Sequence, residues 1–385
     1  MASVLRVGIV GATGYGNYGH HLDTAYDGLS NVEVVAVADP DADGREAAAA
    51  RTGAQSLYSD YREMLRAENL DLVNVCPRNL TDHAEMVIAA AEVGVRGIMC
   101  EKPMAPTLAH ADAMLDACQR AGTRMAVAHR RANAYERHGK QLVDEGLIGD
   151  VRIIRAHGKA DHRSGGQDLM VLGTHMMDSI RYFAGADPVW AFGHVTQDGR
   201  DVTSADIRQG DEGIGLIAGN GVQSYYTFAN GITATFESVP GYPISDLTAT
   251  WLGFEVYGTE GVMSLRSSPS GELYVYPHGQ WTPEDSHAWE RVSIGEWDNH
   301  SDGSVRSAQE RMLLSNTLIA EELVLAVNED RDVEAVSNGH DGRAALEMIM
   351  AVHESQRLQT RVELPLRNRD NPYDTWLAEA GAVPQ

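Results

Sequence analysis

The segment Val95–Pro103, with the sequence VRGIMCEKP, decides how the first half of the chain folds. Its short apolar run predicts a strand, and Glu101-Lys102-Pro103 then places an acid, an amine and a proline at the carboxyl end of that strand. Ligands of open α/β sheets bind beyond these strand ends, so Lys102 stands where chemistry occurs. Because a residue that precedes proline leaves the α region, Pro103 fixes how Lys102 projects. We therefore take Lys102 as the leading catalytic candidate.

Strands and helices alternate around this segment. The runs that predict strands are Val4–Val10, Val32–Ala38, Leu70–Val75 and Arg124–Ala128, and helices are expected at Ala47–Arg51, His83–Glu92 and Leu108–Ala121. This alternation predicts a Rossmann-type domain, an α/β doubly wound parallel sheet over residues 1–128. Polar residues recur at the strand tips, and those expected to contact a cofactor are Pro77, Asn79, His83, Glu101, Lys102 and His129.

A glycine-rich turn, Gly11–Gly19 (GATGYGNYG), directly follows the first strand, and a helix-compatible stretch begins at about Tyr18. Strand, glycine turn and helix form the context of a dinucleotide loop, in which the backbone approaches a pyrophosphate at the helix N-terminus. The turn itself must begin at Gly11. The expected cofactor contacts in this loop are Gly11, Thr13, Gly14 and Tyr15.

Asp39 ends the second predicted strand, about 20 residues or more beyond the glycines. A carboxylate at this place accepts hydrogen bonds from the ribose hydroxyls of NAD and repels the 2′-phosphate of NADP. Arg45 lies too far along the chain to clamp such a phosphate. NAD is therefore the expected cofactor.

Composition excludes several classes of protein. The formal charge of −24, from 31 basic and 55 acidic residues, argues against nucleic acid or an anionic membrane as partner. Three scattered cysteines are too few for a disulfide framework, and no His, Cys or acidic cluster has the spacing of metal ligands. The first residues lack the features of a signal peptide, and no run approaches a membrane span, so a cytoplasmic protein is expected.

The pattern changes beyond about Ala132. A helix is expected at Asn133–Asp144, and the strand-like runs that follow are Val151–Gly158, Val189–Val195, Gly221–Phe228, Ile232–Val239, Leu252–Tyr257 and Gly261–Arg266. They predict an α+β domain over residues 129–385, with a large open, mostly antiparallel sheet. Two further helices are expected at Val305–Asn328 and Gly342–Leu358, and Thr282–Gly303 is interpreted as an insertion or lid, or else a surface loop.

These motifs resemble the Gfo/Idh/MocA (glucose–fructose oxidoreductase, inositol dehydrogenase and rhizopine catabolism) superfamily. The resemblance rests on the glycine loop, Asp39, Pro77-x-Asn79-x-x-x-His83 and, most specifically, Glu101-Lys102-Pro103. It continues through Val256–Gly261 and Asp341–Glu347, and so covers nearly the whole chain. It implies that the second domain binds substrate and packs sheet against sheet, giving a homodimer or homotetramer.

The segment Gly165–Asp178 resembles the family's catalytic helix, in which an Asp and a His four residues apart face the nicotinamide. His175 matches the histidine, but Val171 takes the place of the aspartate. Asp168, seven residues before His175, is a stand-in that reaches the site only if the helix begins later or bends. The match of Asp178 suggests a structural role.

The resemblance implies oxidation of a secondary hydroxyl of a sugar, polyol or glycoside. Lys102 and His175 together would handle the proton, with Lys102 dominant; His175 either accepts it directly or binds the substrate oxygen and relays it. Side chains expected at the substrate are Arg130, Arg131, His162 and Asp168. Two alternatives stay open: a redox-neutral glycosidase or lyase with tightly bound NAD and a keto-sugar intermediate, and a sugar-sensing regulator without turnover.

Overall fold

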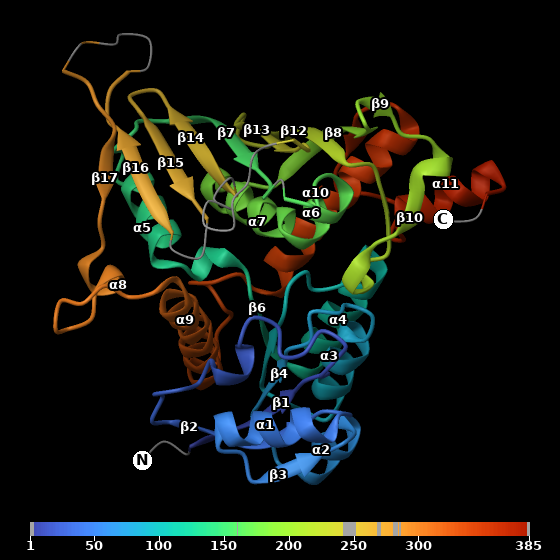
Figure 1. Ribbon diagram of the computed structural model, residues 1–385, viewed down its shortest axis with the longest axis vertical. Helices are drawn as coiled ribbons and strands as arrows, with labels where there is room; N and C mark the ends of the chain where they lie inside the picture. Colours follow the sequence, from blue (N-terminus) through green and yellow to red (C-terminus); the bar gives the residue numbers. More distant parts are fainter. Residues whose placement is uncertain are drawn as a thin grey trace. The chain divides into compact units, whose positions relative to one another are not determined.

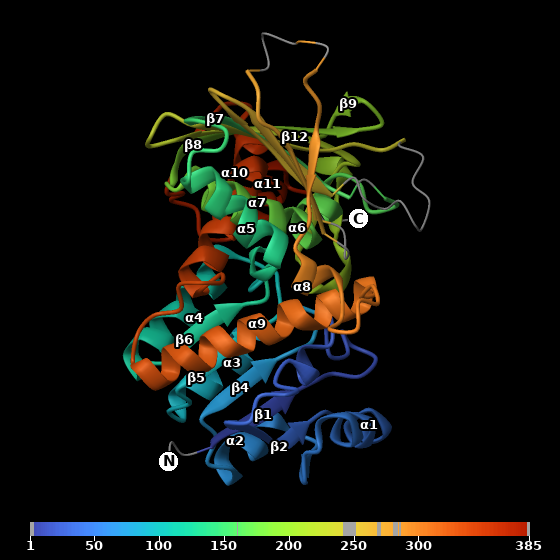
Figure 2. The same cartoon turned by 90° about the vertical axis from the view of Figure 1, so that its left-hand side faces the viewer.

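The computed structural model describes residues 4–159, 161–241, 252–267, 271–279, 284 and 286–382. The chain forms two compact units, drawn from two sides in Figures 1 and 2. Unit 1 comprises Met1–Ala132, Glu212–Ile214 and Leu313–Arg343; unit 2 comprises Asn133–Asp211, Gly215–Met312 and Ala344–Gln385. The sequence placed a single domain boundary after residue 128, which stays a prediction.

Unit 1 is built on a six-stranded parallel sheet with the order β3-β2-β1-β4-β5-β6. This is the Rossmann order, and its direction of winding reverses between β1 and β4, where such sheets bind dinucleotides. The predicted doubly wound sheet is confirmed. Its strands are β1 (Leu5–Val10), β2 (Val32–Ala38), β3 (Ser56–Tyr58), β4 (Leu72–Val75), β5 (Gly97–Cys100) and β6 (Arg124–Val127).

The helices of unit 1 follow local sequence signals. The side chain of Thr107 caps α4 by accepting from the amide of His110, and Gly122 ends that helix at a φ of 72°. The helices are α1 (Ala42–Thr52), α2 (Tyr61–Ala67), α3 (His83–Glu92), α4 (Leu108–Ala121) and most of α9 (Ala308–Glu329), with the 3₁₀ turns η1 (Leu22–Thr24) and η2 (Arg130–Ala132). Apolar side chains of α9, among them Ile319 and Leu323, share one core cluster with Val7 and Ile9 of β1.

The helix predicted from about Tyr18 was wrong. Residues 18–30 form turns and the single 3₁₀ turn η1. Positive φ angles at Gly16, Asn17, Gly19 and His21 break any continuous α-helix here, because such angles lie outside the right-handed helical region. This loop therefore offers no α-helix N-terminus to a pyrophosphate.

Buried hydrogen bonds fix this non-helical segment instead. Asn74, fully buried in β4, accepts from the hydroxyl of Tyr26 at 2.8 Å and donates to the carbonyl of Leu22 at 2.9 Å. The guanidinium of Arg51 in α1 donates twice to the buried carboxylate of Asp23, at 2.9 and 2.6 Å. An asparagine inside a parallel strand is costly unless paired, so these contacts specify the course of the segment.

Unit 2 carries a ten-stranded mixed sheet with the order β17-β16-β15-β14-β7-β13-β12-β8-β18, to which β9 adds beside β8. Its pairs are antiparallel except β7 with β13, which confirms the predicted mostly antiparallel sheet. The strands are β7 (Val151–His157), β8 (Pro188–Gln197), β9 (Arg200–Asp201), β12 (Gly221–Phe228), β13 (Thr233–Ser238), β14 (Gly253–Gly258), β15 (Val262–Arg266), β16 (Glu272–Tyr276), β17 (Glu290–Val292) and β18 (Val362–Glu363).

The helices of unit 2 include α5 (Ala134–Asp144), whose predicted start is marked by the capping side chain of Asn133. The others are α6 (Gly166–Val171), α7 (Gly173–Ala184), α8 (Gly295–Asp298), most of α10 (Gly339–Leu358) and α11 (Pro372–Ala380), with the 3₁₀ turn η3 (Ser204–Asp206) and the small ladder of β10 (Ile207–Gln209) with β11 (Leu216–Ala218). The 3₁₀ turn η4 (Asp211–Gly213) begins in unit 2 and ends in unit 1. Part of the predicted insertion Thr282–Gly303 lies outside the described residues; the rest contains β17 and α8. Among the described residues, no helix is long and apolar enough to cross a membrane.

Candidate functional site

The glycine loop of unit 1 closes on itself. The amides of Ala12 and Asn17 donate to each other's carbonyls at 3.1 and 2.8 Å, and the side-chain oxygen of Asn17 accepts from the amide of Gly14 at 3.0 Å. At Gly14, φ is 78°, and nothing lies within 4 Å of where a Cβ would stand. The backbone of Gly14 is therefore open to a close ligand, which fits a dinucleotide phosphate.

Gly11 has a different reason to be glycine. A Cβ at this position would overlap the ring of Tyr18, which is itself 7% exposed. Gly16 packs in the same way against the next strand tip, since its Cβ would lie 2.5 Å from the amide nitrogen of Asn79. Glycine at these two positions lets the loop pack directly against the ring of Tyr18 and the backbone of Asn79. The predicted cofactor contact of Gly11 stays a prediction.

Asp39 is fully buried at the end of β2, and its carboxylate holds the glycine loop. It accepts from the amide of Thr13 at 3.1 Å, from the hydroxyl of Thr13 at 2.7 Å and from the amide of Asp41 at 2.9 Å. The carbonyl of Asp39 accepts from the guanidinium of Arg45 at 2.5 Å. The structure thus brings Thr13 and Asp39 together, and their contact with the cofactor stays a prediction.

The tip of β4 meets the same loop. Tyr15, 49% exposed, donates from its hydroxyl to that of Thr81 at 3.2 Å, and the side-chain oxygen of Asn79 accepts from the amide of Thr81 at 3.0 Å. Tyr15 and Asn79 therefore lie on one edge of the sheet.

His83 lies beneath this edge, fully buried. Its Nε2 stands 2.6 Å from the carbonyl of Pro77, and its Nδ1 stands 3.3 Å from the carbonyl of Met104. Burial lowers the pKa of His83, so the imidazole is neutral and Nε2–H donates the short bond. His83 thus ties the Pro77 loop to the turn that follows Lys102-Pro103, which is a positioning role. Direct contact of His83 with the cofactor stays a prediction.

Lys102 and Glu101 stand at the tip of β5, as predicted. Lys102 is 5% exposed, Glu101 is 1% exposed, and the Lys102–Pro103 peptide bond is cis. Oε1 of Glu101 lies 2.7 Å from Nδ1 of His20, within hydrogen-bond distance. Burial opposes the ionisation of Glu101, but the charge and hydrogen bond of His20 and the charge of Lys102 outweigh it and lower its pKa. Sequence reasoning missed His20, because the expected helix gave no reason to bring it to β5.

The residues after β6 are buried or half-buried, and two of them contact the segment of residues 336–341. His129 is 2% exposed, with Nδ1 2.9 Å from the hydroxyl of Ser337. Arg131 is buried in an ion pair with Asp341 and donates to the carbonyl of Val336 at 3.0 Å. Arg130 is half-buried. Arg131 thus anchors residues 336–341, and substrate contact by Arg130 and Arg131 stays a prediction.

The segment Gly165–Asp178 of unit 2 is interrupted at Leu172, and whether this brings Asp168 to the site stays a prediction. α6 ends at Val171, and α7 begins at Gly173, with Leu172 between them at a φ of −115°. The carboxylate of Asp168 is fully buried and accepts from the hydroxyl of Ser238, at the end of β13, at 2.5 Å. Val171 and His175 are 5% and 6% exposed. Sequence reasoning missed Ser238, since β13 lies far along the chain.

Predicted residues occur in both units. Lys102 and the expected cofactor residues lie in unit 1, whereas Asp168, His175 and His162 lie in unit 2. The side chain of His162 is 84% exposed and stands 3.8 Å from Asp161. The described ranges contain no group of three or more His, Cys, Asp or Glu side chains suited to a metal ion.

Two sequence profiles of one family match this chain. The profile described as "Oxidoreductase family, NAD-binding Rossmann fold" matches residues 5–129, and that of the "GFO/IDH/MocA C-terminal domain" matches residues 137–264. The chain belongs to the Gfo/Idh/MocA family of oxidoreductases, and its first domain is an NAD-binding Rossmann fold.

Characterised relatives cover part of the chain. A D-apiose dehydrogenase of Paraburkholderia graminis is 31% identical over 268 residues, which are 65% of each chain. A levoglucosan dehydrogenase of Pseudarthrobacter phenanthrenivorans is 28% identical over 63% of this chain and 67% of its own. A D-glucoside 3-dehydrogenase of Escherichia coli is 30% identical over 48% of this chain and 55% of its own. The matched region thus spans about two thirds or less of these relatives.

Solved structures share the fold over nearly the whole length. An NAD binding oxidoreductase from Klebsiella pneumoniae aligns with a TM-score of 0.73 at 21% identity, covering 95% of this chain and 100% of that one. A levoglucosan dehydrogenase in complex with NADH and levoglucosan aligns with a TM-score of 0.71 at 23% identity, covering 94% and 100%. At these identities the likeness establishes the fold.

Proposed function

We propose that this protein is an NAD-dependent dehydrogenase that oxidises a secondary hydroxyl of a sugar, polyol or glycoside. The observation that carries the proposal is the tip of β5, where Lys102, 5% exposed, follows the buried Glu101 within an NAD-binding Rossmann fold. The names of the relatives, which act on apiose, levoglucosan, glucosides and inositol, support this substrate class.

NAD fits the open backbone at Gly14 and, when bound, supplies the hydride acceptor. Thr13, Asp39 and Asn79 would hold the dinucleotide along the strand tips. Lys102 accepts the hydroxyl proton, because burial and a positively charged nicotinamide ring both favour the neutral amine. His175 either shares this proton or binds the substrate oxygen, and Arg130, Arg131, His162 and Asp168 are the proposed substrate contacts.

The test is an absorbance assay at 340 nm with NAD and separate D-apiose, levoglucosan, methyl β-D-glucoside and myo-inositol. An aliquot is first denatured to detect bound nucleotide. Continuous NADH formation supports the dehydrogenase. Copurified NAD with cleavage of the glucoside and no NADH release would instead support the redox-neutral alternative, which the apolar Val171 in the catalytic segment favours. Sugar binding without any turnover would indicate a regulator.

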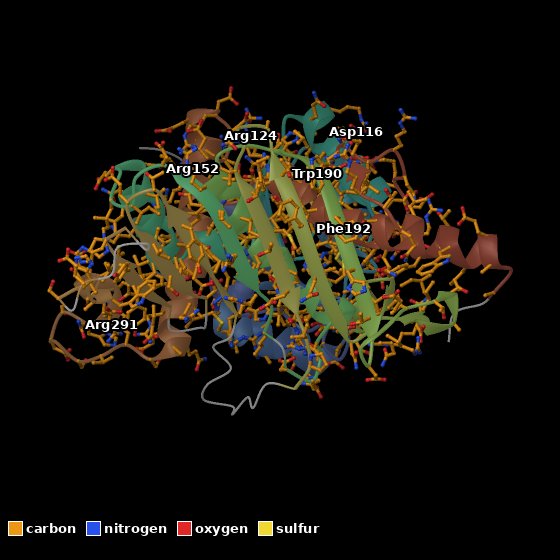
Figure 3. The ribbon with its side chains drawn as sticks, turned by 90° about the horizontal axis from the view of Figure 1, so that it is seen from above. Asp116, Arg124, Arg152, Trp190, Phe192 and Arg291 are labelled. Carbon is orange, nitrogen blue, oxygen red and sulfur yellow. The ribbon has the colours of Figure 1, made fainter. Side chains whose placement is uncertain are left out.

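We also propose a cytoplasmic protein that forms a homodimer or homotetramer through the sheet of unit 2. Figure 3 looks onto the face that carries Trp190 and Phe192. Phe192 and Tyr225 are 43% and 36% exposed, and Trp190 stacks beside Tyr225 with 5.4 Å between ring centroids. Light scattering should give a dimer or tetramer, and Phe192→Lys should reduce the mass to a monomer. The cysteines, which are free and buried, fit a reducing compartment.

A further inference from the structure

His20 connects a buried carboxylate with solvent. Its Nδ1 stands 2.7 Å from Oε1 of Glu101, and its side chain is 43% exposed, whereas that of Glu101 is 1% exposed. Glu101 in turn lies directly before Lys102, whose charge helps to lower the pKa of the carboxyl group. At the tip of β5, the carboxylate of Glu101 is thus acted on by the charge of the neighbouring Lys102 and contacts the exposed imidazole of His20.

The backbone around His20 is held in place from two sides. The side-chain amide of Asn316, in α9, donates to the carbonyl of His20 at 2.8 Å. Gly19 packs so closely that a Cβ there would lie 2.7 Å from the carbonyl of Cys76 and 3.2 Å from the carboxyl carbon of Glu101. The imidazole thus reaches Glu101 from an anchored segment rather than from a free loop.

Three other titratable groups beside Glu101, in the part of the chain that the structure describes, are cut off from water. His83, Cys76 and Cys100 are fully buried. Burial lowers the pKa of His83 and raises the pKa of both thiols, so all three are neutral near pH 7. His20 combines contact with the carboxylate and exposure to solvent.

We propose that His20 carries the substrate proton from the Lys102–Glu101 pair to solvent after each turnover. This inference rests on the proposed function, in which the substrate O–H bond breaks, its proton goes to the amine of Lys102, and hydride goes to NAD. The ammonium must lose that proton before the next cycle, and Lys102 is 5% exposed. The proton passes from Lys102 to the carboxylate of Glu101 and then to Nδ1 of His20 in its neutral form, and the resulting imidazolium loses a proton from Nε2 to water or buffer. Each group regains its starting charge.

The experiment compares the first turnover with later ones. The enzyme is rapidly mixed with NAD and the substrate of the panel that proves active, in dilute buffer at pH 7. The initial phase gives the NADH formed in the first turnover, and the later linear phase gives the steady-state rate. The variants are His20→Ala, His20→Asn and Lys102→Ala. His20→Asn keeps a donor near the position of Nδ1 but cannot pass a proton on. His21→Asn is the control, because asparagine tolerates the φ of 62° at that residue.

We expect His20→Ala and His20→Asn to keep the first turnover and to lose on the order of 100-fold in the steady-state rate, with imidazole in the buffer restoring it. A wild-type steady-state rate in both variants would overturn the relay, as would loss of the first turnover. Wild-type behaviour of His20→Asn alone would show that His20 merely positions Glu101. Lys102→Ala with unchanged turnover would refute the base role of Lys102 and with it the relay, whereas wild-type protein that forms no NADH with any substrate of the panel would refute the proposed function.

A second measurement needs no substrate. The infrared carboxylate band of Glu101, identified by its loss in Glu101→Gln, is titrated in wild type and His20→Ala. Removal of the His20 charge should raise the pKa of Glu101. An unchanged titration would show that the two residues are not coupled and would overturn the relay.

Discussion

The hydroxyl of Thr13 donates a 2.7 Å hydrogen bond to the carboxylate of Asp39, which joins the turn after β1 to the end of β2. The amide of Thr13 donates to the same carboxylate at 3.1 Å. Asp39 is fully buried, so its carboxylate shapes the loop that receives the dinucleotide. The residue from which we infer a preference for NAD is thus also the residue that holds the loop together.

Replacement of Asp39 by alanine should weaken NAD binding and the preference for NAD over NADP together. The change removes the acceptor of the hydrogen bonds from Thr13 and Asp41, at about 0.5–1.5 kcal/mol for each bond, and removes the charge that repels a 2′-phosphate. Calorimetric titration with both nucleotides measures the effect. Thr13→Val is the matched control, because it loses the hydroxyl hydrogen bond to Asp39 but leaves the charge of Asp39 in place. It should therefore keep the preference for NAD over NADP. An unchanged preference in Asp39→Ala would refute this role.

Gly11→Ala should destabilise unit 1 and impair NAD binding, because the new methyl group overlaps the ring of Tyr18. Overpacking of this kind typically costs about 1–3 kcal/mol. Chemical unfolding measures the loss. Gly295→Ala is the control, since nothing lies within 4 Å of a Cβ there, and it should be neutral. The double variant Gly11→Ala/Tyr18→Ala removes this overlap. If NAD binding is impaired equally in the single and the double variant, the overlap with Tyr18 is not the cause, and Gly11 contacts the cofactor directly.

Lys102→Ala should still bind NAD yet lose at least ~100-fold in turnover, the usual scale for a general base. Steady-state rates combined with NAD titration test this. Lys140→Ala serves as the control, because Lys140 pairs with Asp144 on the surface of α5. Turnover of Lys102→Ala near that of the control would show that another group takes the proton.

Val171→Asp restores the acid that other family members place four residues before the histidine. We expect it to lower the free energy of unfolding by about 1–3 kcal/mol without raising turnover, because Val171 is 5% exposed and the bend at Leu172 separates α6 from α7. Val171→Asn isolates the effect of charge from that of polarity. Faster turnover in the aspartate variant would show that the bend does not prevent an Asp–His pair.

His353 should make the stability of unit 2 depend on pH. Burial lowers its pKa from 6.5 to about 3, and its ring stacks on Tyr373 with 4.5 Å between centroids. Between these values the unfolded chain binds a proton that the folded chain does not. His353 therefore has no effect on the free energy of unfolding above about pH 7.5. As the pH falls, its neutral state in the folded chain lowers the free energy of unfolding, by about 2 kcal/mol at pH 5.

His353→Phe keeps an aromatic ring against Tyr373 and cannot titrate. Denaturant unfolding at pH 7.5 and pH 5 should give a smaller loss of stability in this variant than in wild type. His162→Gln is the control, since that side chain is 84% exposed and should leave the pH dependence unchanged. Equal losses in wild type and His353→Phe would contradict the assignment.

Local sequence signals were enough to predict most of the helices and strands and the residues at the strand tips. Helices α3 and α4 begin and end as predicted, and β12 coincides with the predicted run, because caps, glycines and apolar periodicity are local signals. Lys102, Asp39 and Asn79 lie at the carboxyl edge of the parallel sheet because strand direction alone puts them there.

Which of these side chains contact one another depends on how segments far apart in the chain pack together, and local sequence signals do not contain this information. His20 pairs with Glu101 across 81 positions of sequence, and Ser238 reaches Asp168 across 70. The turn after Gly11 is non-helical because Asn74, in a later strand, binds Tyr26 and the carbonyl of Leu22. Such buried polar contacts depend on which distant segments share a core, so the dinucleotide-loop pattern from which the helix at Tyr18 was predicted could not reveal them.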